Sequence, residues 1–358
     1  MKKVVILMFS IALLGASCSK EEQGVFSRPP KAGDVFVAGA IDGKAVLWKN
    51  GVAHYLTDGK RNAEALSVFV YRNNVYAVGY ENSGQIGGQI GGDQTVYYTV
   101  AKLWKNGVAQ NLTDGTRYAE AYSVFVAGGD VYVAGFENSG QMAKLPSWDV
   151  YYYPSVAKLW KNGKSLELTD GTFNAKALSV YVDGKDVYAV GFEERDGSGL
   201  NRFVAKLWKN GNVINLSSSQ GLGSHASSVF VSDGDVYVAG SEGRDAIIWV
   251  NESAQKLTEN TYYYSHSNVN SFYLSGKDIY AVGNHHGRQS SSAQFWKNGV
   301  EQPLDANYLF YSVYVSIGGD IYIAGKLVLN AVLWINGEIQ YLTAENVTSI
   351  AYSVFVVE

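Results

Sequence analysis

A short phrase that recurs along the chain constrains the fold more than any other feature. AKLWKNGVAQNLTDG at 101–115 returns almost unchanged as AKLWKNGKSLELTDG at 157–171. The apolar-Trp part of the phrase occurs seven times, with its tryptophan at Trp48, Trp104, Trp160, Trp208, Trp249, Trp296 and Trp334. Self-similarity of this kind indicates a repeat protein in which each copy forms one supersecondary unit.

Two further phrases give the same count. Segments resembling SVFV begin at Ser67, Ser123, Ser179, Ser228, Ser271, Ser312 and Ser353. Segments resembling VYVAG begin at Val35, Val75, Val131, Val187, Val236, Ile279 and Ile321. Three independent phrases therefore predict seven units, which together occupy residues 33–358.

Each unit has the pattern of four antiparallel strands. SVFV is short and apolar, DVYVAG alternates, and AKLWKN and a weaker segment such as VAQNLT follow. Asn-Gly, Asp-Gly and Gly-Asp pairs between these segments favour tight hairpins. Four strands repeated seven times predict an all-β, seven-bladed β-propeller. A β-helix needs shorter coils, and an array of sandwiches would not repeat one hairpin set so regularly.

The ends of the repeat region predict how the ring closes. The first unit begins with GDVFVAG and lacks an SVFV segment, whereas the chain finishes with SVFVVE at 353–358. We expect 353–356 to form the inner strand of the first blade, beside 34–39. Such pairing leaves no open interface between the terminal blades.

Length differences between units fall on one side of the expected ring. Most of the variation lies between VYVAG and AKLW, with the longest inserts at 80–100 and 136–156. The link from the fourth strand to the next SVFV also varies, as at 217–227 and 259–270. In an up-and-down blade both loops leave the same edge, here named the long-loop face; the other edge is the short-turn face. Binding residues favour loops on a rigid scaffold, so the long-loop face is the functional candidate.

The N-terminal segment resembles a bacterial lipoprotein signal. Two lysines follow Met1, an apolar run spans 4–16, and small residues lead to Cys18, the single cysteine of the chain. The run is too short to span a bilayer and suits a signal-peptide core. The resemblance implies a signal peptide at 1–17, a lipidated Cys18 and a tether at 18–32.

The residues after the cysteine refine the expected location. Lys20-Glu21-Glu22 resembles the export tag of Bacteroidota lipoproteins. That resemblance implies an outer-membrane protein, anchored by its lipid and facing the cell exterior. The net charge is −4 and the sequence has no basic block, so we expect no nucleic-acid partner. We also expect a monomer.

Aromatic and basic side chains in the variable loops are candidate ligand contacts. Tyr and Trp provide large, stiff contact areas with a polar tip. The candidates for glycan or protein binding are Tyr97, Tyr98, Trp148, Tyr151, Tyr152, Tyr153, Tyr262, Tyr263, Tyr264, His285, His286 and Arg288. The alternative is that these rings pack the inserts onto the blades. Adjacent histidines on a strand point to opposite faces, so His285 and His286 form a poor chelate by themselves.

Two positions of the repeat are expected at the mouth of the central channel. Three places before the repeat serine stand Glu64, Glu120, Lys176 and His225, followed in later units by Asn268, Leu309 and Ile350. Two places after the VYVAG glycine stand Glu81, Glu137, Glu193 and Glu242. Carboxylates near one mouth could bind a cation, position a polyol or do acid–base work. The alternative is that matching glutamates cap strand ends in solvent, and we predict neither a metal nor a cofactor.

Short catalytic signatures are absent from the sequence. It contains no nucleophile elbow, HExxH or phosphate loop, and the LTDG pairs lack the alternating acidic ligands of a calcium loop and are interpreted as turns. The repeat region resembles seven-bladed propellers on bacterial surface lipoproteins, without WD40 or kelch signatures. The leading hypothesis is a non-enzymatic binding propeller for glycan or protein. The alternatives are a polysaccharide hydrolase or lyase at the channel mouth, and a structural subunit of an outer-membrane complex.

Overall fold

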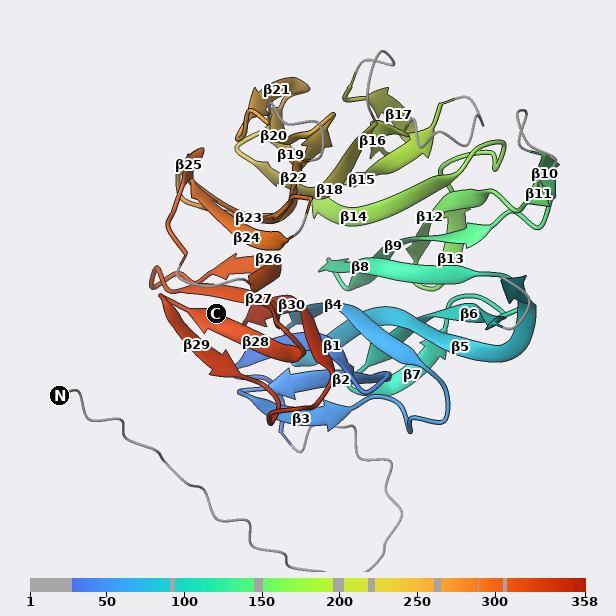
Figure 1. The fold of residues 1–358 in the computed structure, drawn as a ribbon, viewed down its shortest axis with the longest axis horizontal. Helices are drawn as coiled ribbons and strands as arrows, with labels where there is room; N and C mark the ends of the chain where they lie inside the picture. Colours follow the sequence, from blue (N-terminus) through green and yellow to red (C-terminus); the bar gives the residue numbers. More distant parts are fainter. Residues whose placement is uncertain are drawn as a thin grey trace, which may run out of the picture.

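The computed structural model describes residues 28–90, 94–144, 151–195, 203–217, 223–260, 265–288, 290–304 and 308–358; the side chains of 87–96, Lys144 and Tyr151 are not described. The described residues form seven four-stranded antiparallel sheets arranged as blades around a ring (Figure 1), and they contain no helix. The chain is therefore a seven-bladed β-propeller, as the repeats predicted.

The strands of each blade run from the channel outward. Blade 1 is β30 (Ser349–Val356), β1 (Val35–Ile41), β2 (Lys44–Lys49) and β3 (Val52–Tyr55). Blade 2 is β4 (Ala63–Tyr71), β5 (Asn74–Ile90), β6 (Gln94–Lys105) and β7 (Val108–Asn111). Blade 3 is β8 (Ala119–Ala127), β9 (Asp130–Asn138), β12 (Ser155–Lys161) and β13 (Lys164–Glu167), with a small extra hairpin of β10 (Ala143–Lys144) and β11 (Tyr151–Tyr152).

The second half of the ring repeats this order. Blade 4 is β14 (Ala175–Asp183), β15 (Asp186–Glu194), β16 (Phe203–Lys209) and β17 (Asn212–Asn215). Blade 5 is β18 (Ser224–Ser232), β19 (Asp235–Glu242), β20 (Asp245–Val250) and β21 (Ser253–Lys256). Blade 6 is β22 (His266–Ser275), β23 (Asp278–His286), β24 (Ser291–Lys297) and β25 (Val300–Glu301). Blade 7 is β26 (Tyr308–Val315), β27 (Ile321–Leu327), β28 (Asn330–Ile335) and β29 (Glu338–Tyr341).

The last strand closes the ring inside the first blade, as predicted. β30 pairs antiparallel with β1, with Phe355 opposite Phe36 and Val354 opposite Val37. In Figure 1 the red β30 lies against the blue β1. Beyond the strand, the amide of Val357 donates to the carbonyl of Asp34 at 2.9 Å. Three strands from the start of the repeat region and one from its end thus share a sheet, which makes the ring continuous.

The Asn of the WKNG phrase caps the same turn in every blade. Asn50 has a φ of 51°, and Gly51 follows with 79°, as a two-residue hairpin requires. Its Oδ1 accepts from the amide of Val35 at 2.8 Å, and its Nδ2 donates to Asp34 at 2.9 Å. The equivalent pair of bonds recurs around Asn106, Asn162, Asn210, Asn251, Asn298 and Asn336. This part of the repeated phrase is therefore structural.

The repeated tryptophan joins neighbouring blades. Trp104 of blade 2 packs in one buried cluster with Phe36, Ala45 and Leu47 of blade 1. Trp48 of blade 1 packs on blade 7, and its Nε1 donates to the carbonyl of Leu342 at 3.0 Å. The flat indole rings thus fill the space between neighbouring blades.

A β-bulge explains two other invariant features of the repeat. In blade 2 the register of β4 against β5 shifts between Ala65 and Ser67. The bulge brings the carbonyl of Glu64 against Gly79, where any side chain would collide with it. The serine then ties blades together: the Oγ of Ser67 accepts from the amide of Val124 in the next blade at 3.3 Å. Equivalent bonds are present at five other blade junctions.

Seven aromatic side chains form a continuous band around the channel. They stand two places after each repeat serine: Phe69, Phe125, Tyr181, Phe230, Tyr273, Tyr314 and Phe355. Neighbouring ring centroids lie 4.6 to 5.9 Å apart around the whole circle. The band lies toward the short-turn face, because these residues approach the hairpin between the first and second strands. The mouth on the long-loop face is lined by residues that precede the serine.

Candidate functional site at the channel mouth

Two positions per blade line the long-loop mouth. Along each inner strand, residues three places and one place before the serine are half-buried, while the residue between them and the residue before the first are buried. Successive strand residues face opposite sides of a sheet, so both half-buried positions point toward the channel. Because the residue types differ between blades, the mouth is not symmetric.

One side of the mouth is filled by tyrosines around two carboxylates. Tyr122 donates its hydroxyl to Glu120 at 2.6 Å. Burial, followed by the charge of Glu64, raises the pKa of Tyr80 and of Tyr352. Burial and the charge of Glu120 raise the pKa of Tyr118 to about 12. Glu64 and Glu120 therefore lie among phenols that stay protonated at neutral pH.

Lys176 extends this polar group into blade 4. Its Nζ donates to the hydroxyl of Tyr122 at 3.0 Å and lies 4.0 Å from the centroid of the Phe136 ring. Burial lowers the pKa of Lys176, and the charge of Glu120 opposes that effect. Glu120, Tyr122 and Lys176 are thus joined by hydrogen bonds across two blades.

The other side of the mouth is hollow. A cavity of about 630 Å³ lies over blades 4 to 6, where the channel wall is made by Leu178, His225, Ser227, Asn268 and Asn270. The hairpin after β19 and the start of β22 form its rim, with Arg244 and His266. The small or uncharged side chains at these positions leave open the space that Tyr122 and Tyr80 fill on the opposite side.

The amides of the cavity wall are held in one orientation. Asn268 donates through Nδ2 to Oδ1 of Asn270, and Asn270 donates to the carbonyl of Phe310 at 2.6 Å. Within the described part of the chain, no hydrogen bond reaches Oδ1 of Asn268. That oxygen can accept a hydrogen bond from a ligand at the mouth.

His225 is a neutral member of the wall. Its ring lies 4.7 Å from the ring of Phe192 and 4.9 Å from that of Phe203. Burial lowers the pKa of His225 to about 4. At neutral pH the cavity therefore presents an uncharged imidazole, which can donate or accept one hydrogen bond.

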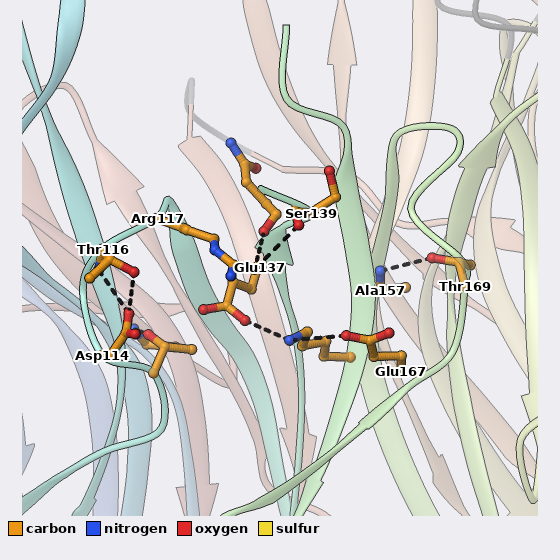
Figure 2. Close-up of polar contacts among 12 residues, drawn as sticks. Asp114, Thr116, Arg117, Glu137, Ser139, Ala157, Glu167 and Thr169 are labelled. Atoms are coloured by element: carbon orange, nitrogen blue, oxygen red, sulfur yellow. Dashed lines mark hydrogen bonds and ion pairs between the residues drawn. The ribbon is translucent and has the colours of Figure 1, made fainter. Parts of the chain in front are cut away.

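The second set of glutamates does not form a ring at the mouth. Glu81, Glu137 and Glu193 are ion-paired with a lysine of the third strand in their own blade: Lys102, Lys158 and Lys206. In blade 3 the carboxylate of Glu137 contacts Lys158, which also reaches Glu167 (Figure 2). Lys102 stands two residues before Trp104, so each pair lies on the tryptophan side of its blade. The shared position of these glutamates reflects repeated packing between strands.

Glu242 lacks the matching lysine, because Ile247 stands at that position in blade 5. The expectation that these glutamates line the channel mouth is thus corrected for Glu81, Glu137 and Glu193, each of which is ion-paired within its own blade. Among the described residues, no group of three or more His, Cys, Asp or Glu side chains could hold a metal ion.

The side chains of His285 and His286 point to opposite faces of β23, as expected for adjacent residues of a strand. His285 faces Ser267 and shares a hydrogen bond of 3.1 Å with its hydroxyl, whereas His286 stacks on His266 with ring centroids 4.9 Å apart. Burial, followed by the neighbouring histidines, lowers the pKa of His286. Arg288 is exposed beside them. The adjacent histidines point to opposite faces and do not form one chelate.

The candidate aromatics of the inserts are only partly brought together. Tyr98 and Tyr153 line one crevice, while Tyr97 is 41% exposed. Burial, followed by the charge of Glu194, raises the pKa of Tyr152. The backbone of Tyr151 pairs with Lys144. Trp148, Tyr262, Tyr263 and Tyr264 lie outside the described residues.

Sequence reasoning missed half of the channel wall. Leu178, Ser227 and Asn270 stand one place before the serine, and only the residues three places before it were considered. The alternation of the inner strand was the available signal, because both positions fall on one face. Arg244, in a short hairpin of blade 5, carries no repeat signal.

No protein-family model matches the chain. No curated protein matches it either. Solved structures with a similar fold include Pyrococcus horikoshii acylaminoacyl peptidase, with a TM-score of 0.45 and 11% identity over 79% of this chain and 53% of that one. Trypanosoma rangeli sialidase has a TM-score of 0.45 and 11% identity, with 80% of this chain and 54% of that one covered. This chain thus spans about half the length of either protein.

Structural neighbours also include extracellular domains from B. thetaiotaomicron. One, assigned to a hybrid two-component system, has a TM-score of 0.41 and 11% identity, with 89% of this chain and 40% of that one covered. The class of the protein follows from its own sheet topology, which is that of a seven-bladed propeller. Among the described residues, no helix is long and apolar enough to cross a membrane.

Proposed function

We propose that this chain is a cell-surface lipoprotein that binds a glycan, without catalysis, at the long-loop mouth of its propeller. The cavity of about 630 Å³ over blades 4 to 6 carries the proposal. Its volume falls within the range of about 300–1,000 Å³ that is usual for small-molecule sites. The other partner class is a protein. Protein ligands usually dock on a broad surface, so this hollow fits a glycan better.

The chemistry of the wall favours a hydroxylated ligand. Ser227, Asn268 and Asn270 are uncharged, and His225 is neutral at physiological pH because its pKa is lowered to about 4. Fixed amides and hydroxyls can both donate to and accept from sugar hydroxyls. Leu178 adds an apolar surface against which the carbon face of a sugar can pack.

The positions of the carboxylates favour binding over hydrolysis. Most glycosidases use two carboxyl groups, one on either side of the scissile bond. The described residues that line the cavity include no Asp or Glu. Glu120 instead accepts a hydrogen bond from Tyr122, and three of the other candidate glutamates are ion-paired with lysines.

A glycan array with the full chain tests the binding function. Asn268→Leu, which copies the leucine that blade 7 has at the same repeat position, is expected to weaken binding of the best ligand at least about 10-fold, because it removes the free acceptor. Asn111→Leu, on the exposed outer strand β7, is the matched control and should bind normally. Turnover of the ligand, or equal binding by both variants, would overturn the proposal. Stable co-purification of one protein, without glycan binding, would instead support a structural subunit.

The location is part of the same proposal and rests on the sequence of residues 1–22. Labelling of cells with a fatty-acid analogue should modify the chain, and Cys18→Ser should abolish the label. Antibody binding to intact cells should detect the propeller. A secreted, unlabelled chain would contradict the anchor on Cys18.

A further inference from the structure

A second hollow on the long-loop face lies between blades 2 and 3. This crevice has a volume of about 220 Å³ and is lined by Tyr98, Thr116, Arg117, Asn138 and Tyr153, with Gly140. Three separate segments meet there. Tyr98 lies in β6, Arg117 in the link from β7 to β8, and Tyr153 just after β11 in the insert of blade 3. The two long inserts thus contribute one tyrosine each to a common site beside an arginine.

Arg117 is exposed and held by the backbone. Its Nη1 donates to the carbonyl of Ser139 at 3.3 Å, and its guanidinium lies over Gly140, where an added Cβ would be 3.0 Å from Cζ. Figure 2 shows Arg117 reaching toward Ser139. The guanidinium is therefore oriented before a ligand arrives, which reduces the entropy lost on binding.

The carboxylates near Arg117 have other partners. Asp114 accepts from the backbone amide of Thr116 at 2.9 Å and from its hydroxyl at 2.7 Å, while Glu137 is paired with Lys158 (Figure 2). Within the part of the chain that the structure describes, no ion pair joins Arg117 to a carboxylate. Hydrogen bonds from Thr116, and after them the charge of Arg117, lower the pKa of Asp114, so a ligand carboxylate would share this positive charge with Asp114.

The equivalent crevice between blades 3 and 4 has different chemistry. Phe173 replaces Arg117 and Glu194 replaces Asn138 at the same repeat positions. That crevice, of about 290 Å³, is lined by Asp170, Glu193 and Glu194 as well as Arg195 and Lys206. The combination of an arginine with two tyrosines is therefore absent from the described residues of the crevice between blades 3 and 4 and is not imposed by the repeat.

We propose that the crevice binds the carboxylate of an acidic sugar. Guanidinium and carboxylate form strong, directional pairs, and tyrosine side chains favour contact with sugar rings through an apolar face and a polar tip. A uronic acid residue of a polysaccharide provides both features. This site is separate from the channel-mouth cavity, since the two share no lining residue.

Trigalacturonate and its methyl ester, titrated calorimetrically into the full chain, test the site. The acid is expected to bind at least about 10-fold more tightly than the ester, because the ester cannot form the ion pair. Arg117→Gln should remove this preference, and Tyr153→Ala should weaken the acid and the ester alike. Arg61→Gln is the matched control. Arg61 stands at the same repeat position and lies against Gly84, but the short Asp42-Gly43 hairpin of blade 1 provides no counterpart of Tyr98.

Equal affinity for acid and ester, or an unchanged preference in Arg117→Gln, would overturn the proposal. An acidic peptide that binds as tightly as trigalacturonate would overturn the assignment to a sugar. Asn268→Leu separates the two sites: it should leave the preference for the acid intact even if the channel mouth binds nothing.

Discussion

The ring of Phe355, from the last strand, packs against the ring of Phe69 in blade 2 with their centroids 5.0 Å apart. Phe355 also contacts Tyr314 of blade 7 at 5.4 Å. One side chain of β30 therefore completes an aromatic band that joins all seven blades. Closure of the propeller depends on this strand through its pairing with β1 and through the core of the channel.

Removal of residues 353–358 should destabilise the whole ring. The truncation deletes half of the inner strand of blade 1 and opens the band, so we expect the melting temperature to fall by about 10 °C or more. Differential scanning calorimetry measures the change. Deletion of Glu358 alone, beyond the end of β30, is the control and should have little effect. A melting temperature that is unchanged after the longer deletion would contradict closure by β30.

Gly79→Ala should be poorly tolerated despite the small change. The added methyl group would collide with the carbonyl of Glu64 at the bulge, and this backbone cannot move without breaking the ladder. We expect a loss of about 3 kcal/mol in the free energy of unfolding, measured by denaturant titration. Gly287→Ala is the control, since its nearest neighbour would be 3.4 Å away. Similar stability of both variants would argue against the steric role of the glycine.

The pair of Glu81 and Lys102 should prove structural. Glu81→Gln leaves the lysine, whose side chain is 13% exposed, without its charge partner, so we expect a loss of about 2–3 kcal/mol in stability. The double change Glu81→Ile with Lys102→Val copies Ile41 and Val46, which are buried at the same positions in blade 1. It should recover most of the loss, and ligand binding should be normal in both variants. A binding defect in the double variant at full stability would instead assign a functional role to the pair.

Stability should fall in mild acid because of His225. Its pKa is lowered from 6.5 to about 4 by burial, so below pH 6.5 the unfolded chain takes up a proton that the folded chain does not. The free energy of unfolding should therefore decrease as pH falls from about 6.5 to 4, by roughly 3 kcal/mol in total. His225→Asn, which copies blade 6, should flatten this part of the profile in denaturant titrations. A parallel pH profile for the two proteins would show that His225 is not the group responsible.

Repeat counting from the sequence predicted the architecture because every blade needs the same packing residues. Each blade repeats the same structural roles. Trp104 fills the space between blades, Asn106 caps the outer turn, and Ser67 forms a hydrogen bond to the next blade. Repetition therefore reveals them without any tertiary information. The closure by 353–356 was visible for the same reason, as a strand missing from the first unit.

The spacing of the repeats does not reveal which way the side chain at each repeat position points. The composition of the candidate site depends on that orientation. Glu64 and Glu81 both occur at repeated positions, yet the first faces the channel and the second pairs with Lys102 on the side of the blade. Seven-fold closure brings Leu178, Ser227 and Asn270 to one hollow, although they lie far apart in the sequence. The sequence by itself determined the propeller, since local strand patterns specify a blade. Only the tertiary structure decided where the mouth is filled and where it is open, because that depends on contacts between side chains from different blades.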